Sequence, residues 1–185
     1  MSCPVTRESL FSTYGANGVR FFPEYSLNHL NSTTSTFLSS VGLPNDHVFD
    51  SGITLQALER SPYELGPLFE LDNRHCPVES QDWQVLGHLP AALVTIDPIS
   101  GKVYVFQESS DEYQLMHRDI ASLVYCLTEF RKLDDAYKAA YPESPNVENL
   151  VESFRQEVDS IDPTPLSDPE SEWNRMLGEV LEEMW

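Results

Sequence analysis

The residue types that most often carry covalent or acid–base catalysis are present in this chain, but they form no known catalytic motif. The five histidines are scattered, at His29, His47, His75, His88 and His117, and no Gly-rich phosphate loop, G-x-S-x-G or H-E-x-x-H pattern occurs. His75 and Cys76 are neighbours, but adjacent side chains of an extended segment point to opposite sides. We therefore expect no Cys–His nucleophile pair there, and predict that Cys76 and Cys126 are small apolar side chains.

The thirty Asp and Glu residues are too numerous for any pair of them to indicate an acid–base couple. Two of them have other predicted roles, because Asp97 fits a tight turn and Asp119 fits the start of a helix. No calcium-loop pattern of alternating Asp or Asn with a central Gly occurs. The sequence therefore predicts no catalytic residue, no metal and no other cofactor.

Net charge is the strongest compositional feature. Eleven Lys and Arg against thirty Asp and Glu give a formal net charge of −19. A field of this sign repels phosphate backbones, so direct nucleic-acid binding is disfavoured, whereas association with a basic protein is accelerated. Solubility alone is the other reading of the same charge.

The acidic segment at residues 107–113 is predicted to be a loop that faces a partner. Its carboxylates Glu108, Asp111 and Glu112, together with the aromatic Tyr113, are of the types that recruit Lys or Arg. Trp83 is a candidate aromatic anchor. These five are the predicted partner-binding residues, and a purely solvated loop is the alternative.

Length and composition define the class of protein. The 185 residues, of which 41% are hydrophobic, suffice for one domain with a substantial core. No apolar run reaches the roughly 18 residues of a membrane span, and residues 1–14 lack the apolar centre of a signal peptide. Three scattered cysteines suit a reducing compartment, so we expect a cytoplasmic protein with no membrane contact.

A β-hairpin is the clearest element predicted to position the candidate residues. Residues 92–96 and 102–106 are rich in β-formers, and the five residues between them include Asp97, Pro98 and Gly101, which favour a tight turn. Further strands are expected at residues 67–71 and 83–88. Because both faces of the hairpin are apolar, helices or other strands should cover each face.

Helices are predicted on both sides of this strand-rich middle. Short helices are expected after Thr6 and at residues 35–41. The longest helix should start at Asp119 and run to residue 140 or 141, since its apolar residues recur every three or four positions.

Two more helices are predicted near the C-terminus. The first follows a cap at Asn146, and the second follows Ser167 and Glu170, which have the spacing of a capping box. An apolar stripe from Trp173 to Met184 should face the core. Residues 143–185 hold twelve acidic and two basic residues, so the outer face of these helices should be strongly anionic.

Several short aliphatic and glycine phrases follow one another in a definite order. They are TFLSSVGLP at 36–44, YELGPLF at 63–69, VLG at 85–87, IDPISGKVY at 96–104 and RDIASLVY at 118–125. In content and order these phrases resemble the SUKH superfamily, specifically its fourth family of bacterial immunity proteins. The resemblance spans about residues 5–140.

This resemblance implies an α+β fold, a single domain with a central antiparallel sheet flanked by N- and C-terminal helices. Residues 1–142 would form the core of that domain, and residues 143–185 an acidic helical elaboration. It also implies a function, the cytoplasmic neutralisation of a bacterial polymorphic toxin, a nuclease or deaminase domain whose active site the protein occludes. A basic toxin domain is the expected partner, because enzymes that act on polyanions are often basic.

Two other functions stay open at the level of the sequence. A non-enzymatic protein-interaction or regulatory scaffold would suit the acidic surface equally well. An enzyme that uses His88, His117 or Cys76 is the third possibility. Alanine changes at those positions would abolish an enzyme's activity but leave an inhibitor mostly intact.

Overall fold

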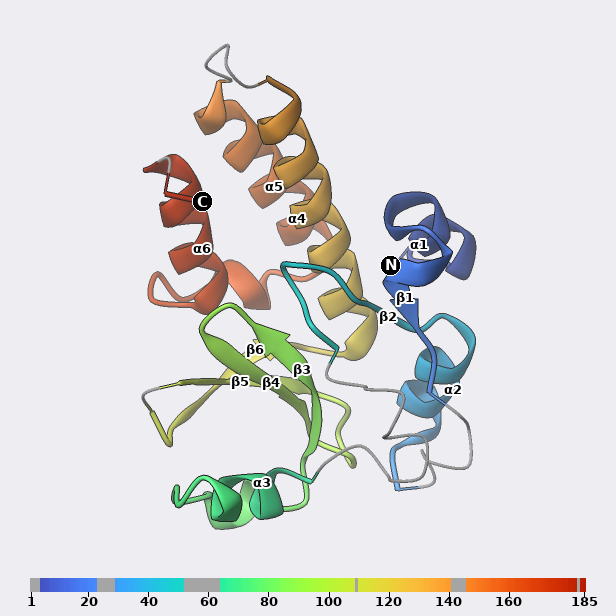
Figure 1. The fold of residues 1–185 in the computed structure, drawn as a ribbon, viewed down its shortest axis with the longest axis vertical. Coiled ribbons are helices and arrows are strands. Elements are labelled where there is room, and N and C mark those ends of the chain that lie inside the picture. Colours follow the sequence, from blue (N-terminus) through green and yellow to red (C-terminus); the bar gives the residue numbers. More distant parts are fainter. Residues whose placement is uncertain (1–3, 23–28, 52–63, 109, 141–145, 183) are drawn as a thin grey trace.

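A four-stranded antiparallel sheet lies between two groups of helices in the computed structural model of the chain (Figure 1). The structure describes residues 4–22, 29–51, 64–108, 110–140, 146–182 and 184–185. The strands are neighbours in space in the order of the sequence: β3 (Gln84–Leu89), β4 (Ala92–Ile96), β5 (Val103–Gln107) and β6 (Tyr113–His117). The chain is a single α+β domain, which confirms the predicted fold class.

The β4–β5 hairpin forms where the sequence predicts it. The Ile99 backbone N–H donates to Asp97 Oδ1 at 2.9 Å, and the Gly101 N–H donates to the Asp97 carbonyl at 2.9 Å. Gly101 has a φ of +73°, a conformation that glycine adopts without steric cost. This turn fixes the register of the two strands, from Ala92 opposite Gln107 to Ile96 opposite Val103.

Backbone from earlier in the chain covers the outer edge of β3. Asp50 and His88 exchange backbone hydrogen bonds of 3.0 and 2.8 Å, and Glu64 forms an isolated bridge with Gln84. Gly87 lies at an irregularity of the β3–β4 register, where an added Cβ would be 2.3 Å from the Asp50 carbonyl oxygen. Glycine at this position therefore permits the close approach of the covering segment.

One face of the sheet packs against the long helix α4 (Ile120–Ala140) and forms the main core. The Ser122 N–H donates to Asp119 Oδ1 at 2.8 Å, so Asp119 caps this helix as predicted. Four N-terminal elements add to the same core: α1 (Arg7–Tyr14), β1 (Val19–Arg20), α2 (Ser32–Ser40) and β2 (Leu43–Pro44). The 3-10 helix η1 (Ala16–Gly18), between α1 and β1, has no buried residue. Within the described ranges, no helix has the length and apolar composition needed to cross a bilayer.

Two C-terminal helices complete the main core. They are α5 (Val147–Ile161) and α6 (Glu172–Leu181), joined through the short 3-10 helix η5 (Thr164–Leu166). The Asn149 N–H donates to Asn146 Oδ1 at 3.0 Å, which confirms the predicted cap of α5. In α6 the fully buried side chains are Trp173, Met176, Leu177 and Val180. Both helices therefore contribute buried side chains to the main core.

The two ends of α6 differ from the prediction. The helix is capped by Ser171, whose Oγ accepts the Asn174 N–H at 3.3 Å. The Ser167 hydroxyl donates to the Thr164 carbonyl, and the Glu170 N–H donates to Asp168 Oδ1, so the predicted capping box of Ser167 with Glu170 is wrong. At the other end, Leu181 and Met184 are exposed, so the buried stripe stops at Val180.

The opposite face of the sheet is covered by α3 (Leu65–Leu71) and η4 (Val78–Ser80), below the sheet in Figure 1. The strand predicted at residues 67–71 is wrong. Pro67 occupies the first turn of α3, where backbone N–H groups have no acceptor within the helix, so proline is tolerated. Leu65 and Phe69, four positions apart, are 0 and 1% exposed and belong to the same buried cluster as Phe106.

Candidate partner-binding surface

The predicted acidic loop joins β5 to β6 and is shorter than expected. Glu108, Asp111 and Glu112 are exposed within it, as surface residues should be. Tyr113 is not in the loop, because it is the first residue of β6 and pairs with Phe106. Strand β6 was missed by the sequence analysis.

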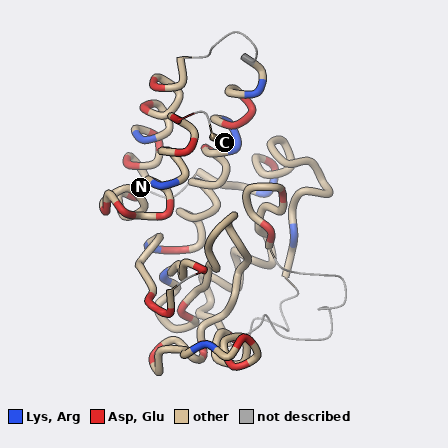
Figure 2. Tube along the Cα trace, turned by 60° about the vertical axis from the view of Figure 1, so that its left-hand side comes forward, with Lys and Arg blue, Asp and Glu red and all other residues tan. Residues whose placement is uncertain are grey.

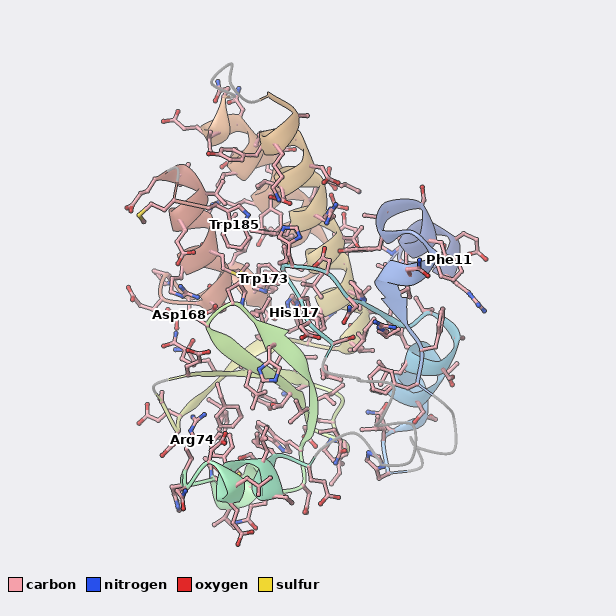
Figure 3. All side chains as sticks on the ribbon, viewed as in Figure 1. Phe11, Arg74, His117, Asp168, Trp173 and Trp185 are labelled. Atoms are coloured by element: carbon pink, nitrogen blue, oxygen red, sulfur yellow. The ribbon has the colours of Figure 1, made fainter. Side chains whose placement is uncertain are left out.

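Arg74 ties the loop to the segment that follows α3 (Figure 3). Its Nε donates to Asp111 Oδ1 at 3.0 Å, and its Nη2 donates to the Ser110 carbonyl. The guanidinium carbon lies 4.2 Å from the centroid of the Phe69 ring, so a cation–π contact holds the arginine from below. Arg74, the only Lys or Arg among the described residues 64–82 and 110–117, is thus already paired with a carboxylate.

Tyr113 makes the second link between the loop and the α3 side. Its hydroxyl donates to Glu79 Oε1 at 2.8 Å. This hydrogen bond raises the pKa of Tyr113 above its usual value, and the pKa of Glu79 is lowered, first by a backbone hydrogen bond and then by Tyr113. A hydroxyl that donates to an ionised carboxylate accounts for both directions.

Trp83 lies beneath this surface rather than on it. Its ring stacks on Tyr104 at 4.1 Å between centroids and meets the edge of Tyr113 at 4.8 Å. With 6% of its area exposed, Trp83 packs in the smaller core with Phe69 and Phe106. It can therefore stiffen the aromatic floor under Tyr113, but it presents little area of its own to a partner.

We define the acidic surface by the residues of the loop and of its α3-side neighbours: Glu79, Glu108, Asp111, Glu112 and Tyr113. Residues 64–82 contain five acidic residues and one Arg, and residues 107–117 contain three acidic residues and no Lys or Arg. Figure 2 shows acidic positions over most of the molecule, several of them at its lower end around α3. Two large apolar side chains stand out from the same region, Leu71 with 79% and Val78 with 76% of their area exposed.

Sequence reasoning missed four contributors to this region: Leu71, Arg74, Val78 and Glu79. Arg74 and Glu79 reach the loop from 37 and 34 positions away in the sequence. No local pattern indicates such contacts. Leu71 belongs to the segment predicted as a strand. In the helix α3 it lies two residues from the buried Phe69 and therefore on another face, which is exposed.

The second polar cluster is buried and includes the residue types of a hydrolase triad. Ser122 Oγ lies 3.2 Å from His117 Nδ1 and donates to Asp162 Oδ2 at 2.8 Å. Trp173 Nε1 donates to His117 Nε2 at 2.9 Å (Figure 3). Because the indole can only donate, Nε2 must accept, and the proton of the neutral imidazole resides on Nδ1.

The burial of this cluster and the pKa shifts of its members indicate a structural role. Burial lowers the pKa of His117, while Asp162 acts in the opposite direction. Burial alone would raise the pKa of Asp162, but contacts with His117, Thr164, the Arg118 N–H and Ser122 hold it well below its usual range. His117, Ser122 and Asp162 are at most 2% exposed, so a substrate cannot reach the Ser122 hydroxyl. The cluster joins β6 to α4 and to the C-terminal helices.

The remaining candidate residues for catalysis are His88 and Cys76. His88 is exposed at the β3 edge, whereas Cys76 is buried beside Ser80, with 3.6 Å between Sγ and Oγ. Burial raises the pKa of the Cys76 thiol, which disfavours the reactive thiolate. In the part of the chain that the structure describes, no group of three or more His, Cys, Asp or Glu side chains is arranged to hold a metal ion.

The described residues form a single α+β domain, and Arg74 and Tyr113 tie the acidic β5–β6 loop to the α3 side of its sheet. A family model described as SUKH-4 immunity protein matches residues 5–183. The chain therefore belongs to the SUKH-4 immunity protein family, within the SUKH superfamily, and its family's partner is a protein toxin. The match runs past residue 140 and includes α5 and α6. No curated protein and no solved structure matches the chain.

Proposed function

We propose that this chain is a cytoplasmic immunity protein that binds a basic toxin domain through the acidic surface and occludes its active site. Membership of the family supports the immunity role. We choose the acidic surface as the binding site because carboxylates are in excess around the β5–β6 loop. Its neighbouring arginine, Arg74, already pairs with Asp111, which leaves Glu108 and Glu112 for a partner.

The chemistry of this surface favours a toxin that acts on nucleic acid, a nuclease or a deaminase. Such an enzyme needs a positively charged groove for its polyanionic substrate. A rigid surface with carboxylates at its rim would enter that groove in place of phosphates. The exposed Leu71 and Val78 would supply apolar contact area next to the charges.

Survival of toxin-producing cells tests the proposed function. The toxin domain encoded beside this chain is produced in a sensitive cell, with and without the chain, and binding of the purified pair is measured. Rescue together with tight binding is the expected result. Absence of both, with each protein folded, would remove that toxin as the partner.

A charge-neutral triple variant tests the surface. Replacing Glu108→Gln, Asp111→Asn and Glu112→Gln should reduce the association rate constant about tenfold at low salt, because steering by these charges is lost. The matched control is Glu148→Gln, Asp159→Asn and Glu170→Gln, which removes three exposed charges from the C-terminal segment. Equal effects of the two triples would show that net charge, and not this surface, governs association.

A further inference from the structure

The two edges of the sheet are covered differently. The β3 edge is bridged by Asp50 and Glu64, whereas β6 is the last strand at the other side. Strand β6 contacts η5, and just after its C-terminal end the Arg118 N–H donates to Asp162 Oδ2 at 3.1 Å. Among the described residues, no backbone hydrogen bond joins the stretch Tyr113–Leu115 to an element other than β5, and Gln114 and Leu115 are exposed.

The hydrogen-bond register shows which backbone groups of β6 point outward. Asp97 N–H bonds to the Lys102 carbonyl, and Glu108 N–H bonds to the Ala91 carbonyl. In an antiparallel ladder every second residue bonds to the same neighbour, so the even-numbered residues of β5 bond to β4 and the odd-numbered ones bond to β6.

Val105 and Gln114 are therefore the hydrogen-bonded pair of β5 and β6. It follows that Tyr113 and Leu115 direct their N–H and C=O groups away from the sheet. Within the described part of the chain, no backbone hydrogen bond from either residue to another element occurs. These groups form a short template for one more strand.

The sequence of β6 lacks the residue types that usually protect such an edge, and the irregularity of the β5–β6 register falls beyond Leu115. Natural edge strands carry Lys, Pro or inward-pointing charges that prevent pairing with another chain. Tyr-Gln-Leu-Met-His contains none of them, and Leu115 is 43% exposed. The edge is instead bordered at its start by Asp111 and Glu112, so the segment that fits it is basic.

We propose that the toxin docks by adding an extended, Lys- or Arg-containing segment to the open edge of β6, with the outward groups of Tyr113 and Leu115 as its hydrogen-bond partners. This inference rests on the proposed function, since the occupant is the toxin. Main-chain bonds would hold the segment, and the exposed Glu112, next to the start of the strand, would select its basic side chains. Strand addition also explains why β6 is anchored firmly at His117 and open at Tyr113.

Amide hydrogen exchange of the full chain, free and bound to the toxin domain encoded beside it, tests the proposal. The amides of Tyr113 and Leu115 should exchange at least roughly tenfold more slowly in the complex than in the free chain. The Gln114 amide is the internal control, because it already bonds to β5 in the free protein. This measurement uses the unmodified chain and does not depend on the folding of a variant.

A proline at position 115 provides a second test. Leu115→Pro removes an outward N–H without removing a bond to β5, and should weaken binding about tenfold, the value of one or two backbone hydrogen bonds. Leu115→Ala controls for the side chain and should bind within about threefold of the original chain.

The outcomes separate the two proposals. Slower exchange at Tyr113 and Leu115, with weaker binding of only the proline variant, supports strand addition. Binding and rescue without protection of these amides overturns strand addition and leaves the immunity function in place. A toxin domain that neither binds nor is neutralised overturns both proposals for that partner.

Discussion

At the residue scale, His117 is a buried imidazole held in one protonation state. Its Nε2 accepts from Trp173, and its Nδ1 faces Ser122 and Asp162. A protonated imidazole could not accept from the indole, so one hydrogen bond would be lost and a charge would be buried. Asp162 and Asp119 are the charged groups that oppose this effect.

We predict that His117 makes the protein less stable as the pH falls below neutral. The unfolded imidazole titrates near 6.5, and burial lowers the folded pKa, so the unfolded state binds more protons below that value. The stability is present above about pH 6.5 and decreases toward the folded pKa. Between about pH 7 and about pH 5 the loss from this group is at most about 2 kcal/mol.

The variant His117→Gln is the matched control for this prediction. A glutamine amide can accept from Trp173 and donate toward Asp162, but it does not titrate. Chemical unfolding at several pH values should therefore give a flatter profile for the variant than for the unmodified chain. The lowered pKa of Asp162 adds its own loss only below its ordinary value of 3.8, outside this range. If stability changed with pH equally in the variant and the unmodified chain, the pH dependence could not be assigned to His117.

At the element scale, α3 shows how a short apolar run supports two secondary structures. A strand over residues 67–71 would place Phe69 and Leu71 on the same face, since side chains of a strand repeat every second residue. The helix instead buries Phe69 and leaves Leu71 79% exposed. The second face of the sheet needs cover, and this tertiary requirement decides between the two structures.

Two alanine variants of α3 distinguish these structures by experiment. Phe69→Ala should lower the free energy of unfolding by about 3–5 kcal/mol, because it leaves a cavity in the smaller core. Leu71→Ala, two residues away, should change it by no more than about 0.5 kcal/mol. Denaturant unfolding of both variants measures the difference. Comparable losses would mean that Leu71 is also buried and that α3 is not placed as described.

The elements that the sequence predicts correctly are those with local signals. Asp97 and Gly101 mark the β4–β5 turn, and the regular apolar stripe after Asp119 marks α4. Strand β6 has no such signal, because Gln114 and Leu115 are both exposed and break the alternation. Its position depends on pairing with β5 and on the buried cluster around His117, both of which are long-range contacts. The acidic loop could be predicted from composition, whereas its links to Arg74 and Glu79 could not.

At the scale of the whole molecule, the C-terminal helices are expected to be necessary for folding. Phe130 of α4 is fully buried, and its ring lies 5.8 Å from Phe154 and 5.7 Å from Trp173. A chain that ends at residue 142 would expose Phe130 and would leave His117 without Trp173 and Asp162. We predict that this fragment shows no cooperative thermal unfolding by circular dichroism, while the full chain does. A cooperative transition in the fragment would show that residues 143–185 are an addition to a complete domain.

The net charge of −19 should govern the rate at which the toxin is captured. The Debye length is about 30 Å at ~0.01 M salt and about 8 Å at ~0.15 M, so the field of the whole chain reaches a partner only at low ionic strength. We predict that the association rate constant with the toxin domain falls ten- to a thousandfold as salt rises, while the dissociation rate constant changes little. Stopped-flow or surface-based kinetics over this salt range measures both constants.

Because buried contacts and main-chain hydrogen bonds are screened much less than exposed charges, the dissociation rate reports on the docking surface itself. A salt-independent association rate would show that the charge serves solubility and that the toxin recognises this surface by shape.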